Sequence, residues 1–205
     1  MNYLEFKNKL FDLGGFHTHQ VYSWDPGFNR NNIGRWLRKG LLIRLRRGYY
    51  TFPEYTHKPD FALYFANHIY RPSYISLHTA LSFYGMIPES VVQITSVTTL
   101  KTASFINDVG EYHYRSIHRR LMFGYRRTTM TDGRALQLAT PEKALLDLLY
   151  LYPFYNSADA LENLRLDEDF LNKDLDLDLL HKQLSAFENK ELDKRVQLML
   201  NTYNL

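Results

Sequence analysis

The chain contains no cysteine and no long apolar stretch, and each absence excludes a class of chemistry. Without Cys, disulfide bonds, thiolate metal sites and cysteine nucleophiles are excluded. The longest apolar run, Ala144 to Phe154, is interrupted by Asp147 and is too short to span a bilayer. The first residues lack the continuous apolar core of a signal peptide. We therefore expect a soluble, cytoplasmic protein with no membrane partner.

The usual signatures of enzymes are also missing. The sequence has no Gly-rich phosphate loop, and Ser76 and Ser82 do not stand in the Gly-x-Ser-x-Gly setting of a hydrolase nucleophile. His17 and His19 are close in sequence, but no carboxylate cluster completes a metal site with them. We therefore expect no catalytic residue, no metal and no cofactor, and we predict that the protein is not an enzyme.

Charge is distributed unevenly along the chain. Met1 to Lys58 holds ten basic and four acidic residues, for a net charge of +6. Pro59 to Pro153 has a net charge of +2, and Phe154 to Leu205 has a net charge of −5. Because the phosphate backbone of nucleic acid attracts a basic surface and repels an acidic one, the two ends of the chain are expected to meet different partners.

The most basic segment, Phe28 to Phe52, contains seven Arg or Lys residues and no Asp or Glu. Ile33, Trp36 and Leu37 share one face of a helix from about residue 30 to 39, which ends at Gly40 and leaves its basic residues to solvent. A basic, solvent-facing helix of this kind suits the major groove of DNA.

A basic hairpin is predicted directly after this helix. Ile43 and Leu45 alternate with Arg residues, and Arg47-Gly48 forms the expected turn into Tyr49 to Phe52. A basic helix followed by a basic hairpin is typical of a winged helix-turn-helix, in which the hairpin reaches phosphates or the minor groove. The sequence therefore predicts binding to double-stranded DNA.

The candidate contacts divide by side-chain type. Asn and Arg in the helix can make bidentate contacts with base edges, whereas Lys39 and the hairpin residues are expected at phosphates or in the minor groove. The candidates for base edges are Arg30, Asn31, Asn32, Arg35 and Arg38, and the hairpin residues are Arg44, Arg46 and Arg47.

Two more helices are predicted upstream, and a boundary downstream. An apolar stripe formed by Leu4, Phe6, Leu10 and Leu13 predicts a helix over residues 3–13, stopped by two glycines, and Thr18 caps a short helix over residues 19–24. Residues 53–59, with a Pro at each end, are the expected linker. The predicted fold class is α+β, with a winged helix-turn-helix DNA-binding domain over residues 1–57 and a mixed helix/sheet (α/β) domain over 58–205.

The second domain is predicted from caps, β-branched runs and apolar periodicity. Ser76 is expected to cap a helix that ends at Gly85, and Thr140 one that begins at Pro141. The predicted helices are 60–69, 77–85, 141–152, 179–187 and 191–200, and the predicted strands are 91–99, 111–117, 121–127 and 134–138.

Four segments in order carry a family resemblance. They are Tyr74-Ile-Ser-Leu-His-Thr-Ala-Leu-Ser-Phe-Tyr-Gly-Met-Ile-Pro-Glu89, Ile94-Thr-Ser-Val-Thr-Thr99, Phe123-Gly-Tyr125 and Ala139-Thr-Pro-Glu-Lys-Ala-Leu-Leu-Asp-Leu-Leu-Tyr150. Behind a winged helix, this ordered set resembles the AbiEi-type antitoxins of type IV toxin–antitoxin systems. The resemblance runs from about Gly40 to Tyr152.

The resemblance implies two activities. The N-terminal domain of such antitoxins represses its own operon by binding inverted repeats in the promoter. The C-terminal domain neutralises a co-encoded toxin with a nucleotidyltransferase fold. Because the quoted segments are mostly apolar, we interpret them as fold-defining, and the resemblance identifies no toxin-contacting residue.

The sequence leaves three other interpretations open but favours none of them. A transcriptional regulator without a toxin would use its second domain for ligand sensing or dimerisation. A nuclease would need Pro59-Asp60 to meet Glu188-Asn-Lys190, which lies far away, in a stretch expected to be helical and not on a strand. The acidic run 174–178 is similar to nucleotidyltransferase carboxylates, but the Gly-Ser element of those enzymes is missing nearby, so we interpret the run as the first turn of a helix.

Overall fold

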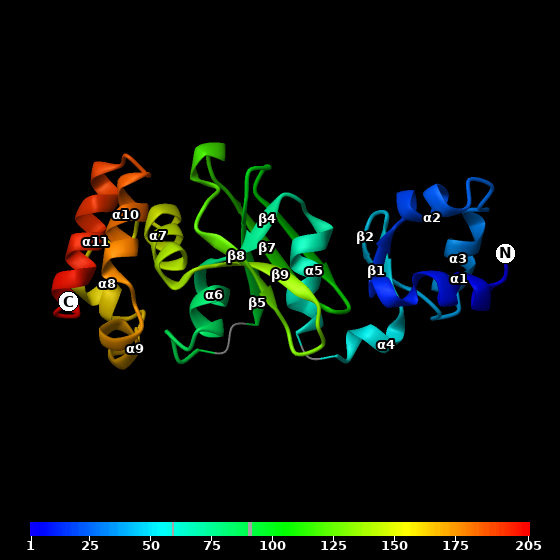
Figure 1. Ribbon diagram of the computed structural model, residues 1–205, viewed down its shortest axis with the longest axis horizontal. Coiled ribbons are helices and arrows are strands. Elements are labelled where there is room, and N and C mark those ends of the chain that lie inside the picture. Colours follow the sequence, from blue (N-terminus) through cyan, green and yellow to red (C-terminus); the bar gives the residue numbers. More distant parts are fainter. Residues whose placement is uncertain (59, 90–91) are drawn as a thin grey trace.

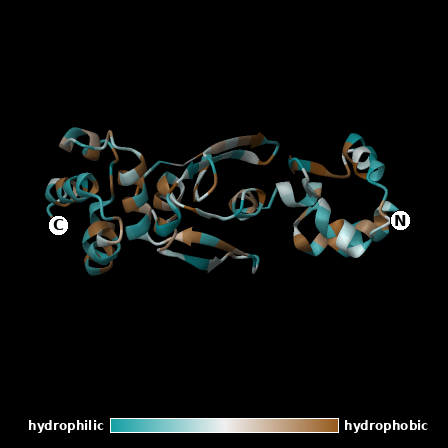
Figure 2. Cartoon of the chain, turned by 90° about the horizontal axis from the view of Figure 1, so that it is seen from above, coloured by the Kyte–Doolittle hydropathy of each residue, from teal (hydrophilic) through white to brown (hydrophobic). Residues whose placement is uncertain are grey.

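The computed structural model describes residues 1–58, 60–89 and 92–205 and is a mixed α+β structure, as the sequence predicts. The molecule is elongated, with an N-terminal unit at one end, a sheet with its helices in the middle, and a group of C-terminal helices at the other end (Figure 1). Hydrophobic residues occur in all three parts (Figure 2). The buried ones form a single cluster that runs from Phe6 to Tyr203.

The N-terminal unit combines helices with a small antiparallel sheet of order β1-β3-β2. Its core is aromatic: the Phe6 ring lies 5.3 Å from Phe16, 5.6 Å from Phe28 and 4.6 Å from Trp36, measured between centroids. The elements are α1 (Tyr3–Leu10), η1 (Phe11–Leu13), β1 (Gly15–His17), α2 (Thr18–Trp24), α3 (Asn31–Arg38), β2 (Ile43–Arg46), β3 (Tyr49–Thr51) and α4 (Pro53–Thr56).

Helix α1 departs from its predicted apolar stripe. Asn2 and Glu5 cap its start reciprocally, with the Glu5 N–H donating to Asn2 Oδ1 at 3.0 Å and the Asn2 N–H donating to Glu5 Oε2 at 3.2 Å. Leu4 is 65% exposed because it lies two residues from buried Phe6, on nearly the opposite side of the helix. Leu13 is exposed because it falls in η1, where the 3.6-residue period no longer applies.

The predicted cap of α2 is also shifted by one residue. His17, not Thr18, occupies the N-cap, and its Nδ1 accepts the His19 N–H at 3.1 Å while the Gln20 side chain accepts the His17 N–H at 2.7 Å. The shift arises because residues 15–17 form β1, a strand that the sequence did not predict and that leads directly into the helix.

The middle of the molecule is a mixed sheet of order β6-β7-β5-β4-β9-β8. Helix α5 covers one face, where the Tyr114 hydroxyl donates to the Ala66 carbonyl at 2.6 Å. Helices α6 and α7 cover the other, where Thr79 and Thr95 are hydrogen-bonded at 3.0 Å. The elements are α5 (Phe61–Ile69), β4 (Ser73–Ile75), α6 (Leu77–Phe83), β5 (Gln93–Thr98), β6 (Ala103–Asn107), β7 (Gly110–Ser116), η2 (Arg119–Leu121), β8 (Tyr125–Thr129), β9 (Ala135–Ala139) and α7 (Pro141–Leu151).

The predicted helices of this part are confirmed, and its strands only partly. Strand β4 was missed because its three residues are all buried and show no alternation, and β6 was missed as well. The predicted strand 121–127 is wrong in its first half, since Leu121 lies in η2 and β8 begins at Tyr125. The predicted start of β5 at Val91 lies outside the described residues.

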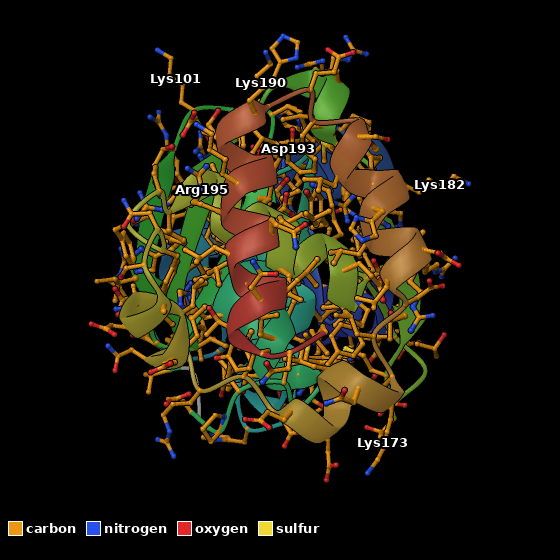
Figure 3. The ribbon with its side chains drawn as sticks, turned by 90° about the vertical axis from the view of Figure 1, so that its left-hand side faces the viewer. Lys101, Lys173, Lys182, Lys190, Asp193 and Arg195 are labelled. Carbon is orange, nitrogen blue, oxygen red and sulfur yellow. The ribbon has the colours of Figure 1, made fainter. Side chains whose placement is uncertain are left out.

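Short acidic helices pack behind α7 and complete the chain. The predicted helix start in the acidic run is confirmed: Asp176 is the N-cap of α10, and its carboxylate accepts the Leu179 N–H at 2.9 Å. Helices α10 and α11 lie outermost, with Lys173 and Lys182 projecting away from the protein (Figure 3). The elements are α8 (Ala158–Glu162), α9 (Glu168–Lys173), α10 (Leu177–Ser185) and α11 (Lys190–Thr202).

Helix α7 is buried on every side because it lies between the sheet and these helices. Its buried residues include an ion pair. Lys143 and Asp147, one turn apart, are bonded to each other and fully buried. Asp147 Oδ2 also accepts hydrogen bonds from the Tyr74 and Ser76 hydroxyls, both at 2.8 Å. Ser76 therefore occupies the predicted N-cap of α6, but its hydroxyl bonds to Asp147 and does not cap the helix.

The Lys143 side chain is enclosed by aromatic rings and by a glycine. Its Nζ lies 4.9 Å from the Phe123 ring centroid and 4.7 Å from that of Phe187. Gly124 has a φ of +69°, and a Cβ at this position would come within 2.9 Å of Lys143 Cγ. The Phe-Gly-Tyr segment thus needs its glycine both for backbone conformation and for the approach of the lysine stem.

The segment predicted as a linker is packed. Residues 53–56 form α4, and Tyr55 is buried with its ring 5.1 Å from Phe61. At Gly15 a Cβ would lie 2.1 Å from the Phe65 ring, so the N-terminal unit rests directly on α5. Pro59, the end of the predicted linker, lies outside the described residues. The domain limits at 57 and 58 stay a prediction.

We expect Asp147→Ala to lower the free energy of unfolding by about 3–5 kcal/mol, because it leaves the Lys143 charge buried without a partner. Urea denaturation of Asp169→Ala supplies the control, since its i,i+4 pair with Lys173 is exposed and contributes at most about 0.5 kcal/mol. The double variant Lys143→Met with Asp147→Leu should recover part of the loss. If Asp147→Ala destabilises the protein as little as Asp169→Ala does, the buried pair does not have this role.

Candidate nucleic-acid interface

Helix α3 is held by local capping and by two buried anchors. Asn29 Oδ1 accepts the Asn31 N–H at 2.9 Å at the start of the helix. Gly40, with a φ of +67°, follows its C-cap. Ile33 and Trp36 are buried, so the face that carries the polar and basic residues is turned away from the core.

That outward face holds the predicted helix residues. Arg30, Asn31, Arg35, Arg38 and Lys39 are all exposed. The half-buried Asn32 accepts a hydrogen bond from Arg35 Nη2 at 2.8 Å, which orients the Arg35 side chain. Within the part of the chain that the structure describes, no carboxylate forms an ion pair with these five exposed side chains.

Helix and hairpin residues also meet across a shallow hollow of about 350 Å³. Arg30, Asn31 and Arg38 line it from α3, and Arg44 and Tyr50 line it from the hairpin. A hollow with three guanidinium groups on its walls attracts anions such as a DNA phosphate. The structure therefore brings residues from both predicted elements onto one surface.

The hairpin has the predicted two-residue turn. Gly48 has a φ of +85° in the turn, and Arg44 and Arg47 are exposed. The pairing of β2 with β3 shifts register between Arg44 and Arg46. Simple alternation would place Arg44 and Arg46 on the same face of the hairpin, and this irregularity turns them apart.

Arg46 differs from the other hairpin arginines because it is half-buried and contacts the rest of the protein, and its role at DNA stays a prediction. Its Nη1 donates to the Ile69 carbonyl at 2.5 Å, and its guanidinium lies 4.8 Å from the Tyr70 ring and 4.2 Å from the Phe105 ring. These partners come from α5 and from β6. The sequence pattern of the hairpin could not reveal them, because they follow 23 or more residues later.

A second cleft, of about 460 Å³, separates the N-terminal unit from α5. His17 and His19 line it from one side, and Tyr64 and His68 from the other. His68 Nδ1 donates to the Tyr64 carbonyl at 2.8 Å, and burial lowers the pKa of this imidazole to about 4. His68 is therefore neutral in the folded protein at neutral pH.

The nuclease hypothesis acquires no supporting geometry. Glu188, the nuclease candidate, lies between α10 and α11 and pairs with Arg120, while Pro59 lies outside the described residues. Over residues 1–58, 60–89 and 92–205, no group of three or more His, Asp or Glu side chains could hold a metal ion. In those same ranges, every helix is too short or too polar to cross a membrane.

Sequence reasoning missed the polar residues inside the apolar motifs. Tyr74, Ser76, Lys143 and Asp147 come from two of the quoted segments and converge on one buried site. The available signal was the i,i+4 spacing of a Lys and an Asp within an otherwise apolar helix.

Neither models of known protein families nor curated proteins match this chain. The functional interpretation therefore rests on its own residues and geometry.

Arg46→Ala should lower the free energy of unfolding by about 1–3 kcal/mol, because it removes a charge-assisted hydrogen bond and two cation–π contacts. Arg44→Ala, two residues away and exposed, should change it by less than about 0.5 kcal/mol. Chemical denaturation measures both. Equal stability of the two variants would show that Arg46 does not hold the hairpin to β6.

His68 should make the protein less stable in acid. Its pKa in the folded protein, about 4, lies below the value of about 6.5 expected when unfolded, so its contribution is full above pH 6.5 and is lost as the pH falls toward 4. Between pH 7 and 5 the loss is about 2 kcal/mol. Urea titrations measure the free energy of unfolding at both pH values. Between pH 7 and 5, His68→Gln should lose about 2 kcal/mol less than the unmodified protein does. An identical pH dependence in the variant would exclude a depressed pKa.

Proposed function

We propose that the protein is a cytoplasmic, sequence-specific DNA-binding antitoxin that represses its own operon and neutralises a co-encoded nucleotidyltransferase-like toxin. In this proposal it is not an enzyme. The N-terminal unit acts as a winged helix-turn-helix, and its ligand is double-stranded DNA carrying inverted repeats in its own promoter.

The observation that carries the DNA half is the basic face of α3 and the hairpin, which is exposed and free of carboxylate partners among the described residues. The order α1-β1-α2-α3-β2-β3, with the sheet order β1-β3-β2, supports the winged-helix interpretation. Helix α3 has eight residues and is about 12 Å long, which suits the width of the major groove.

Side-chain chemistry suggests how the contacts divide. Asn31 and the Asn32–Arg35 pair offer the amide and guanidinium groups that pair with adenine and guanine edges. Arg30 and Arg38 stand beside Arg44 at the hollow and serve both bases and phosphates. The phosphate contacts of the proposal are Lys39, Arg44 and Arg47, and Arg46 stays a candidate beside them.

The antitoxin half draws its support from the opposite end of the molecule. The acidic C-terminal helices lie far from α3 along the long axis (Figure 1). DNA repels such a surface, which leaves these helices free for a protein partner while the N-terminal unit is bound to an operator. The motifs of the resemblance surround the buried Lys143–Asp147 pair, in keeping with a fold-defining role.

A second candidate is a regulator without a toxin, whose second domain senses a ligand. A cavity at the end of the main sheet, lined by Arg71, Arg127 and Gln137 among others, favours it. Co-expression with the product of an adjacent nucleotidyltransferase gene separates the two candidates. Relief of growth arrest supports the antitoxin, and arrest that persists while operator binding is intact supports the regulator.

Arg35→Ala combined with Arg38→Ala should weaken binding to a duplex from the protein's own upstream region by about 1–3 kcal/mol per lost contact. Fluorescence anisotropy measures this against a scrambled duplex at two salt concentrations. For the unmodified protein, four to six neutralised phosphates predict a log–log salt slope of roughly −4 to −5.

Lys173→Ala combined with Lys182→Ala is the matched control, because it removes the same charge from the distal helices shown in Figure 3. It should leave operator affinity nearly unchanged. If the Arg35 and Arg38 variant binds as tightly as this control, α3 is not the reading element.

A further inference from the structure

A cavity of about 450 Å³ opens at the end of the main sheet, where β4 begins. Strands β4 and β9 are neighbours at the register of Ile75 and Leu138. At Gln137 of β9, the Asn67 side chain takes the place of β4 as hydrogen-bond partner, and its Oδ1 accepts the Gln137 N–H at 2.6 Å. The cavity lies where the pairing of β4 with β9 ends, and side chains of α5, β4, β8 and β9 line it.

The walls of this cavity are rich in hydrogen-bond donors. Arg71 and Arg127 are exposed and line it, together with Gln137, Tyr125 and Met122. Its lining contains no Asp or Glu, and across residues 1–58, 60–89 and 92–205 no ion pair involves either arginine. The Arg71 Nε donates to the Asn67 carbonyl at 3.0 Å, which holds this guanidinium at the cavity. Two guanidinium groups without a carboxylate in the lining favour an anion.

Two deeply buried polar groups in the lining lack a partner. Asn67 and Ser73 are only 6% and 7% exposed, yet Asn67 Nδ2 and Ser73 Oγ make no hydrogen bond with any described residue. Leaving such donors unsatisfied costs about 1–3 kcal/mol each. An amide N–H and a hydroxyl beside two guanidiniums form a donor set that matches the oxygens of a phosphate group.

From this donor set we infer that the cavity is a binding site for a phosphate-bearing small molecule of about mononucleotide size. The arginines pair with the phosphate at the rim, and Asn67 and Ser73 donate to it from deeper in the cavity. Tyr125 and Met122 supply apolar surface for the remainder of the molecule. The volume falls within the usual range of ligand pockets. This site does not depend on the proposed DNA and toxin functions.

The depth of the donors favours a small molecule over a DNA backbone. A duplex reaches exposed arginines easily, but each of its phosphates has a sugar on both sides. A terminal phosphate can enter the cavity end first and approach Asn67 and Ser73 together with the arginines at the rim.

Isothermal titration calorimetry of the full chain tests the site with AMP, inorganic phosphate and adenosine at constant ionic strength. AMP should bind with a stoichiometry of one, inorganic phosphate should compete with it, and adenosine should bind much more weakly. Arg127→Ala should weaken AMP binding about tenfold. Arg126→Ala is the matched control, because successive residues of β8 point to opposite faces, and it should bind AMP normally.

Ser73→Ala separates binding from folding. Removal of an unpartnered buried hydroxyl should leave the thermal midpoint of the free protein unchanged or raise it, while AMP affinity falls several-fold. The inference is overturned if no phosphate probe binds at millimolar concentration, or if Arg126→Ala and Arg127→Ala weaken AMP equally. It is also overturned if Arg127→Ala weakens binding of an upstream duplex but not of AMP.

Discussion

The buried ion pair of Lys143 and Asp147 is the constraint on which the arrangement of the second domain depends. Two charges without access to water are tolerated only when every oxygen and proton finds a partner. Asp147 meets this requirement with the Lys143 ammonium and the hydroxyls of Tyr74 and Ser76. Strand β4, the start of α6 and helix α7 must therefore occupy fixed positions at once. Burial lowers the pKa of Lys143. The Asp147 carboxylate opposes this decrease because it favours the charged form of the lysine.

A second set of contacts fixes the basic face relative to the sheet. Arg46 ties the hairpin to α5 and β6, and the Asn107 amide donates to the Leu45 carbonyl at 2.9 Å. On the other side of the junction, the Arg134 guanidinium lies 4.5 Å from the Tyr55 ring. These contacts involve cations, aromatic rings and backbone carbonyls, and they add to the apolar contacts that join both parts in one core. The cleft beside them shares His68 and Arg71 with the phosphate site that we propose, so the two sites are neighbours along α5.

The elements predicted well are those governed by neighbours in sequence. Helix α3, the Arg47-Gly48 turn and the Thr140 cap follow from apolar spacing and capping chemistry, which act over a few residues. The elements predicted badly are short and depend on distant partners. Strand β4 has three buried residues that carry no period. Strand β1 was hidden by two glycines, of which Gly15 permits the close approach of Phe65. For the same reason, the hairpin pattern did not reveal the contacts of Arg46 with α5 and β6.

The sequence alone determined that a basic helix and hairpin stand at one end of the chain and acidic helices at the other, because charge and local periodicity are properties of neighbouring residues. It also determined most helix boundaries. Only the tertiary structure decided that Arg46 faces inward, that Ser76 serves Asp147 and not its own helix, and that Asn67 and Ser73 share a cavity with Arg127. Each of these outcomes joins residues more than twenty positions apart. Such contacts are set by the packing of whole elements, which no local pattern encodes.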